Sequence, residues 1–90
     1  MSQAIVDPIE IRRFVQNLKR FNGDLQADLA GLHTQLIALG DTWRDQEHDK
    51  FRQVFEETLI ILDRFLETSN EQIPYLLRKA ERIEEYLQQR

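Results

Sequence analysis

Gly40-Asp41-Thr42-Trp43-Arg44-Asp45 is the short polar stretch that divides this 90-residue chain into two amphipathic segments. Glycine tolerates the left-handed conformation that often ends a helix, and aspartate is among the residues that best cap the start of one. The apolar pattern pauses over these residues and resumes beyond them. The stretch therefore predicts a hairpin turn near residues 40 to 45, with a helix on each side.

The segment before the turn predicts one long helix over residues 8–39. Asp7-Pro8-Ile9-Glu10 provides a capping carboxylate, a proline at the first helical position and a glutamate three residues after the cap. Apolar residues then recur at steps of three or four. Asp28 occupies the next heptad site, where the pattern requires an apolar residue, and Leu29 one position later continues the stripe. This shift predicts a local stutter. The stripe comprises Ile11, Phe14, Leu18, Phe21, Leu25, Leu29, Leu32, Leu36 and Leu39.

The segment after the turn predicts a second helix over residues 46–88, capped by Asp45. Its stripe comprises Phe51, Phe55, Thr58, Leu62, Phe65, Ser69, Ile73, Leu76, Ala80, Ile83 and Leu87. Further apolar residues widen this stripe, namely Val54, Ile61, Leu66 and Leu77. The second helix therefore offers more apolar surface than the first can cover.

Pro74 is the one local conflict with a continuous second helix, because its ring opposes the carbonyl of Asn70 and removes one backbone hydrogen bond. We expect a kink between about Ser69 and Ile73. The alternative is a break there, with Ser69 or Asn70 as caps, giving a monomeric three-helix bundle. The kinked hairpin is favoured because no glycine or long polar loop is available for a reversal.

Two helices of these lengths are rods of about 48 Å and about 64 Å. Packed antiparallel, they meet along one line only and leave part of each apolar stripe in water. We therefore expect residues 1–90 to form one all-α hairpin domain that dimerises into an antiparallel four-helix bundle. The residues predicted to hold the bundle are Leu18, Phe21, Leu25, Leu29, Leu32, Leu36, Phe55, Leu62, Phe65 and Leu76.

Counting outward from the turn sets the start of the first helix opposite roughly Leu76, so residues 78–90 are expected to project beyond it. The same geometry brings a basic group in the first helix, comprising Arg12, Arg13, Lys19 and Arg20, beside an acidic group in the second, comprising Asp63, Glu67 and Glu71. We interpret these charges as complementary solvated faces. The tail cations Arg78, Lys79 and Arg82 are a weaker candidate contact site.

Composition excludes several classes of protein. Lys and Arg number 12 against 16 Asp and Glu, and the net charge of −4 disfavours a nucleic-acid partner. The absence of cysteine excludes disulfide and thiolate metal sites. The longest aliphatic run, residues 59–62, is far shorter than the roughly 20 residues of a membrane span. With no signal-peptide pattern at its start, the chain is expected in the cytoplasm, or secreted without a cleaved signal peptide.

Four side chains invite a functional interpretation. Trp43 either fills the end of the bundle core or anchors a partner. Asp45 and His48 share a helical face at a spacing found in metal-binding bundles, but helix capping explains Asp45 and no second ligand pair exists. His33 is interpreted as a histidine at the edge of the packed stripe. We therefore expect no metal, no cofactor and no catalysis.

Trp43 lies in the turn between two long predicted helices, and an aromatic residue, Phe51, follows eight positions later. With Asp45, these residues form a turn motif over which the chain resembles the WXG100 (ESAT-6-like) family. Members are helical hairpins that pair into four-helix dimers, and many are exported by type VII secretion without a cleaved signal. Here Trp43-Arg44-Asp45 has Asp where the family has Gly. The family's C-terminal Tyr-x-x-x-Asp/Glu signal is not matched, since Arg90 follows Tyr86 at that spacing.

The resemblance implies a non-catalytic interaction protein that pairs with itself or with a paralogous hairpin, as a type VII-like secretion substrate or the partner of one. Two alternatives stay open. A cytoplasmic coiled-coil-like adaptor would share every packing feature and differ in cellular context. A metal-binding helical bundle would require additional inward carboxylates.

Overall fold

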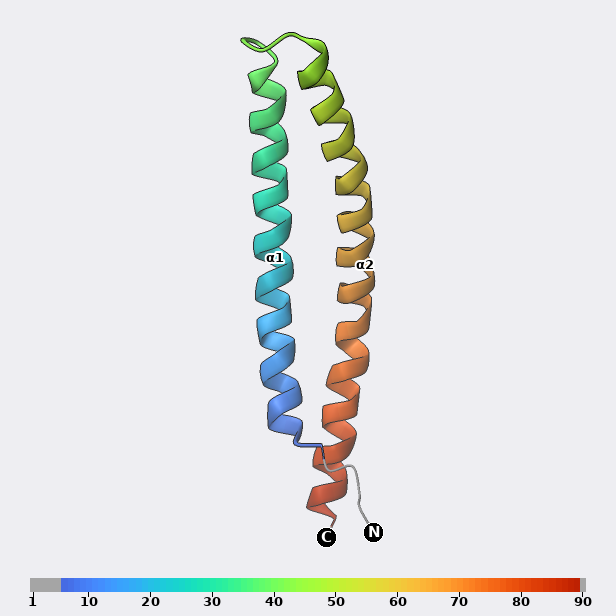
Figure 1. Cartoon of the computed structure of the whole chain (residues 1–90). Helices are drawn as coiled ribbons and strands as arrows, with labels where there is room; N and C mark the ends of the chain where they lie inside the picture. The colour runs from blue at the N-terminus through green and yellow to red at the C-terminus, as the bar shows by residue number, and fades with distance from the viewer. Residues whose placement is uncertain (1–5, 90) are drawn as a thin grey trace.

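A computed structural model of the protein describes residues 6–89, which form two antiparallel helices joined by a short turn (Figure 1). Helix α1 spans Pro8–Leu39 and helix α2 spans Gln46–Gln88. Both bounds agree with the predicted ranges, and the all-α hairpin is confirmed. The start of α1 and the end of α2 lie at the same end of the rod, opposite the turn (Figure 1).

Each helix begins at the aspartate that the sequence identifies as its cap. The Asp7 carboxylate accepts the Ile9 N–H at 2.9 Å, and the Asp45 carboxylate accepts the His48 N–H at 3.0 Å. These bonds satisfy backbone donors that a helix start leaves unpaired. Acidic residues in both first turns add a favourable interaction with the helix dipole.

Helix α2 runs without interruption through Pro74. The alternative of a break and a third helix is therefore excluded. Figure 1 shows a gentle bow of α2 along its length, without a sharp change of direction. Pro74 is exposed on the outer surface, where the carbonyl that it leaves unpaired within the helix can meet water.

The seam between the helices follows an uninterrupted heptad. In α1 the buried residues Pro8, Val15, Asn22 and Leu36 fall on one seven-residue repeat, with half-buried Leu29 completing it. In α2 the buried residues Leu66, Ile73 and Ala80 fall on another. A second row in each helix is half-buried, comprising Ile11, Leu18 and Leu25 of α1 and Phe55, Leu62, Ser69, Leu76 and Ile83 of α2. This is the side-chain pattern of an antiparallel coiled coil.

The predicted stutter in α1 is wrong. The sequence stripe passed through Phe14 and Phe21, but these side chains are 56% and 53% exposed, and Val15 and Asn22 occupy the seam instead. The stripe favoured the larger apolar residues over a valine and an asparagine one position later. With Val15 and Asn22 in place, the heptad passes Leu25 and Leu29 without a change of phase.

The prediction that residues 78–90 project beyond the first helix is wrong for residues 78–84, which lie beside α1. Ala80 is fully buried, and Arg12 forms an ion pair with Glu84 at 2.7 Å. Contact between the helices therefore continues about two turns past Leu76. The small Ala80 side chain allows the helices to stay close there, whereas the prediction treated both as straight rods counted outward from the turn.

The hairpin is too slender to bury most of its apolar residues. It measures 68 × 22 × 17 Å, and its radius of gyration is 20.3 Å, against about 12 Å for a compact chain of this length. Its accessible surface of 7483 Å² exceeds the roughly 5,500 Å² expected for a compact protein of this mass. Besides Pro8, the buried apolar side chains in the described part of the chain are Val15, Leu36, Leu66, Ile73 and Ala80.

Candidate protein-interaction surface

One side of the seam is closed by polar contacts, and we call it the polar flank. Arg12 pairs with Glu84 through two hydrogen bonds of 2.9 and 2.7 Å, and His33 Nε2 lies 2.8 Å from the Glu56 carboxylate. Arg52 also donates to Glu56, at 3.2 Å. These side chains connect the helices near both ends of the rod.

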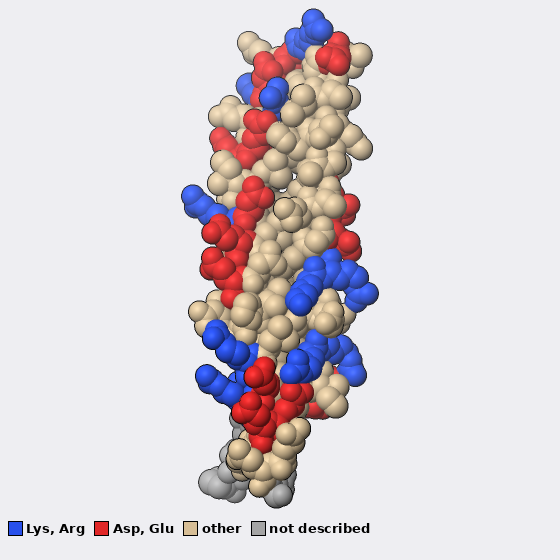
Figure 2. All heavy atoms as spheres, turned by 180° about the vertical axis from the view of Figure 1, so that it is seen from behind, with Lys and Arg blue, Asp and Glu red and all other residues tan. Residues whose placement is uncertain are grey.

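The basic and acidic groups of the sequence form no ion pairs with each other among the described residues. Arg12 bonds to Glu84, and Arg13 bonds to Glu10 in its own helix. No ion pair within residues 6–89 involves the predicted acidic group at positions 63, 67 and 71. Figure 2 shows Lys, Arg, Asp and Glu side chains spread over the exposed surface of one face, with many of the acidic ones along one edge. These charges are solvated, in keeping with their interpretation as a water-facing surface.

The polar flank makes the hairpin sensitive to acid. The hydrogen bond from Arg12 lowers the pKa of Glu84, and the bond from His33 lowers the pKa of Glu56. A carboxylate with a depressed folded pKa stabilises the fold above its unfolded value, here 4.5, and this contribution is lost as pH falls through the folded pKa. The polar flank should therefore weaken only below about pH 4.5.

Glu84→Gln should make the hairpin less sensitive to acidification. The variant keeps a hydrogen-bond acceptor for Arg12 but has no proton to gain, so its melting temperature should fall less than that of the wild type between about pH 5 and about pH 3. Circular dichroism melts across this range measure the difference. Glu85→Gln, at an exposed neighbour, is the control and should follow the wild type. Equal acid sensitivity of all three proteins would refute the role of Glu84.

A polar layer interrupts the apolar seam at its middle. Asn22 is buried, and its side-chain amide donates to Ser69 Oγ at 2.9 Å and to Asn70 Oδ1 at 3.1 Å. The Asn22 Oδ1 atom is buried without a hydrogen-bond partner among the described residues. A buried asparagine at a seam position selects one alignment of the helices at a cost in stability. We infer that this layer fixes the register of α1 on α2.

Asn22→Leu should raise the free energy of unfolding by about 1 kcal/mol, because it removes an unpaired buried acceptor and fills the site with an apolar side chain. Ser69 and Asn70 are partly open to water and can replace their lost bonds there. Urea unfolding measures the change, and Gln16→Leu, at an exposed site of α1, should leave stability nearly unchanged. A loss of about 1 kcal/mol or more in Asn22→Leu would instead show that the layer is net stabilising.

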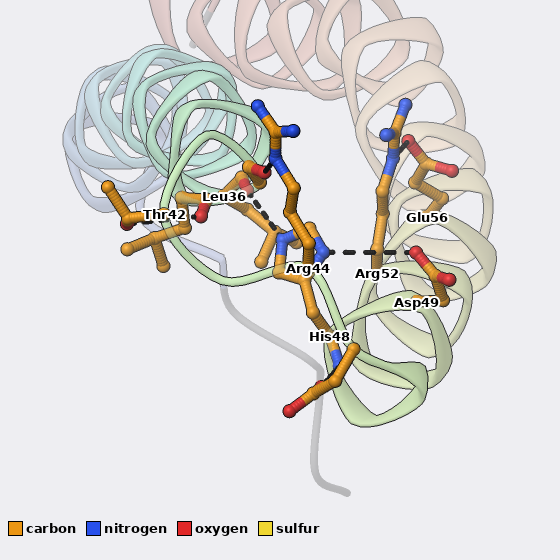
Figure 3. Close-up of polar contacts among 10 residues, drawn as sticks. Leu36, Thr42, Arg44, His48, Asp49, Arg52 and Glu56 are labelled. Atoms are coloured by element: carbon orange, nitrogen blue, oxygen red, sulfur yellow. Dashed lines mark hydrogen bonds and ion pairs between the residues drawn. The ribbon is translucent and has the colours of Figure 1, made fainter.

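The turn end is closed by His48, which α2 directs back towards α1 (Figure 3). His48 is buried, and its Nε2–H donates to the Leu36 carbonyl at 3.0 Å. The half-buried Trp43 ring lies edge-on to the imidazole, with 5.0 Å between ring centroids. Arg44 donates to the Gly40 carbonyl at 3.2 Å. Trp43 therefore packs into the end of the hairpin, while part of its ring stays accessible.

Gly40 is required at the turn for space rather than for a left-handed backbone. Its φ is −60° and its ψ is −16°, which any residue adopts. A Cβ atom here would lie 3.1 Å from the Ile37 carbonyl oxygen and 3.3 Å from His48 Cε1. The sequence identified the correct residue for the wrong reason, because the constraint is the space left by the Ile37 carbonyl and the His48 ring.

The other residues of the predicted turn motif serve the helix start. Asp45 caps α2, and its pKa is lowered chiefly by the hydrogen bond from the His48 N–H, with a further contribution from Trp43. Phe51 is exposed and lies near Phe55, with ring centroids 6.3 Å apart. Within residues 6–89, no three histidine, aspartate or glutamate side chains converge as a metal site.

The side of the seam opposite the polar flank carries exposed apolar residues. Arg12, His33 and Glu84 of the polar flank stand four positions after a seam residue, whereas Phe14, Phe21 and Phe65 stand one position before one. At 100° per residue these two positions lie on opposite sides of a helix. We call this second side the open face, and its exposed apolar members are Phe14, Phe21, Leu32, Phe51, Val54, Ile61, Phe65 and Tyr75.

The structure divides the predicted bundle residues between the seam and the open face. Leu36 is buried in the seam. Six others are half-buried between the helices and the open face, namely Leu18, Leu25, Leu29, Phe55, Leu62 and Leu76. Phe21, Leu32 and Phe65 remain exposed on the open face. Only part of the predicted set is therefore covered within one hairpin.

Several residues of the seam were missed by the sequence analysis. Val15 and Asn22 were passed over for Phe14 and Phe21, and His48 was weighed only as a metal ligand. For Val15 and Asn22, the signal that could have identified them is their seven-residue spacing from Pro8, because a coiled-coil seam can contain an asparagine as well as a valine.

No family model, curated protein or solved structure matches this chain. Within the described residues, no helix has both the length and the apolar character needed to cross a membrane.

Proposed function

We propose that the protein is a non-catalytic helical hairpin that works by pairing with a second hairpin to form a four-helix bundle. The observation that carries this proposal is the open face, where exposed apolar side chains recur at heptad spacing, most of them on α2, in a chain that buries few apolar side chains. Exposed apolar patches of this extent mark interaction sites in soluble proteins. A second hairpin would cover exposed apolar residues of the open face, and the two hairpins together would form a four-helix assembly.

The excess surface of the hairpin supports this proposal. The accessible area is larger than that of a compact protein of equal mass by about 2,000 Å². Stable interfaces bury about 800 Å² on each partner. The area available on one chain is therefore sufficient for a stable dimer, and the polar flank would stay in water.

We further propose that this hairpin acts as WXG100 proteins do, as an exported substrate or its partner. Support comes from Trp43 at the turn between two long helices and from the cap that Asp45 provides where the family has glycine. Secretion of the tagged chain by a host with a type VII system, and its loss when the secretion ATPase is deleted, would support this role. Retention of the chain in both strains would favour the cytoplasmic adaptor.

Thermal unfolding at several concentrations tests the pairing itself. If two hairpins fold together, the melting temperature should rise by several degrees between about 1 µM and about 100 µM chain, because mass action favours the assembled state. A melting temperature that is independent of concentration over this range would contradict the proposal.

A further inference from the structure

Helix α2 carries a second heptad seam on its outer side. From Phe51 to Tyr75 the residues of this seam are uncharged, and they are Phe51, Val54, Thr58, Ile61, Phe65, Thr68, Gln72 and Tyr75. They alternate in steps of three and four, as in a coiled coil. Glu47 and Lys79 continue the same spacing at the two ends. We call this row, with its two terminal charges, the outer seam.

Helix α1 has no equivalent row. At the corresponding positions Phe14 and Phe21 are separated by Asn17, and they are followed by Asp24 and Asp28. A partner that covered α1 centrally would remove these two carboxylates from water without offering them a partner, which is costly. The open face is therefore most favourably covered along α2.

The outer seam is complementary to a reversed copy of itself. When two such rows run antiparallel, Phe51 faces Tyr75, Val54 faces Gln72, Thr58 faces Thr68 and Ile61 faces Phe65. The outer seam consists of two seven-residue rows, one that starts at Phe51 and one that starts at Val54. Each of these pairs joins a residue of one row to a residue of the other, as expected for an antiparallel coiled coil.

The charges at the two ends of the outer seam are also complementary to those of a reversed copy. In the antiparallel arrangement, Glu47 of each copy faces Lys79 of the other. Lys79 lies with Arg78 and Arg82 around Tyr75 in a shallow basic pocket, whose Arg78 guanidinium lies 4.7 Å from the Tyr75 ring centre. In a parallel arrangement Glu47 would face Glu47 and Lys79 would face Lys79, which is repulsive.

We propose that the partner is a second copy of this chain, bound antiparallel through the outer seam of α2, with its two-fold axis between Ile61 and Phe65. This inference rests on the proposed pairing function and adds to it the identity, polarity and register of the partner. Such an interface is self-complementary, as a two-fold axis requires. It places the turn of one hairpin beside the start of α1 and the end of α2 of the other.

Disulfide mapping tests the polarity and register. The chain has no cysteine, so Thr58→Cys and Thr68→Cys can be introduced together without competing thiols. Within one helix the two positions are about 15 Å apart, too far for a disulfide. Mild oxidation of the double variant should join position 58 of one chain to position 68 of the other, identified by peptide mass spectrometry. Links of 58 to 58 and 68 to 68 would show a parallel dimer and overturn the proposal.

Single variants provide the matched controls. Thr58→Cys alone and Thr68→Cys alone should not form linked dimers, because the antiparallel arrangement separates each position from its copy. A double variant that sediments as a dimer but forms no link would also overturn the outer seam, while leaving pairing through another surface intact. A double variant and a wild type that both sediment as monomers would instead refute the proposed function itself.

Charge reversal provides a second test of polarity. Glu47→Lys should weaken the dimer about fivefold or more, because each dimer contains two Glu47–Lys79 contacts. Adding Lys79→Glu should restore the affinity to within about twofold of the wild type. If the double reversal is no tighter than Glu47→Lys alone, the proposed facing of these residues is wrong.

Discussion

Replacing Val15 with aspartate is expected to unfold the hairpin at room temperature. Val15 is fully buried at the seam of α1. A carboxylate there would be removed from water without a cationic partner, at a cost on the order of 4 kcal/mol or more. Domains of this size are stable by about 5 to 15 kcal/mol, and this slender seam should lie at the lower end. Circular dichroism should show most of the helical signal lost.

Gln16→Asp is the matched control for this substitution. It introduces the same carboxylate one position later, on an exposed part of the same helix. Its melting temperature should lie within a few degrees of the wild type. If Val15→Asp melted cooperatively at a similar temperature, the heptad that passes through Val15 could not be the seam.

Replacing Phe65 with aspartate is expected to abolish pairing while leaving the hairpin helical. Phe65 is 46% exposed on the open face, so the single hairpin can accommodate the change. In a symmetric dimer both copies carry the new charge beside the interface centre. Each loses about 2 kcal/mol of apolar burial and buries a carboxylate. The dissociation constant should rise at least about 100-fold.

Ile60→Asp is the control that separates the open face from general loss of apolar surface. Ile60 is 55% exposed and lies towards the polar flank of the same helix. Its substitution should leave the dimer intact. Equal loss of pairing in both variants, or in neither, would contradict the assignment of the open face as the interaction surface. Sedimentation velocity at matched concentrations distinguishes these results.

The sequence was sufficient to predict the helices and the turn, because their signals are local. Asp7 and Asp45 cap the helices at the expected positions, and Gly40 marks the end of the first. Such signals depend only on a few neighbouring residues and on backbone donors that need a partner.

The seam was harder to predict, because it depends on which of two neighbouring rows faces the other helix. Phe21 and Asn22 compete for the same seam position, and hydrophobicity alone favours Phe21. The bond between Asn22 and Ser69 comes from the opposite helix and is invisible in a local pattern. The role of His48 likewise depends on the Leu36 carbonyl across the turn. Long-range polar pairs of this kind require a three-dimensional arrangement.

The candidate interaction surface was predicted in part. Phe21, Leu32 and Phe65 were expected inside a four-helix bundle, and a single hairpin leaves all three exposed. Their exposure follows from the width of the stripe, which is greater than one partner helix can cover. What the periodicity did not indicate is that α2 offers a longer uninterrupted row than α1.

Sedimentation equilibrium of the wild-type chain tests the central claim most directly. At about 50 µM, the concentration used for the comparison, the account predicts a mass of twice the 10.8 kDa chain. It also predicts that Phe65→Asp sediments as a single chain under the same conditions. A wild-type protein that is helical, cooperatively folded and 10.8 kDa in mass at this concentration would contradict the account.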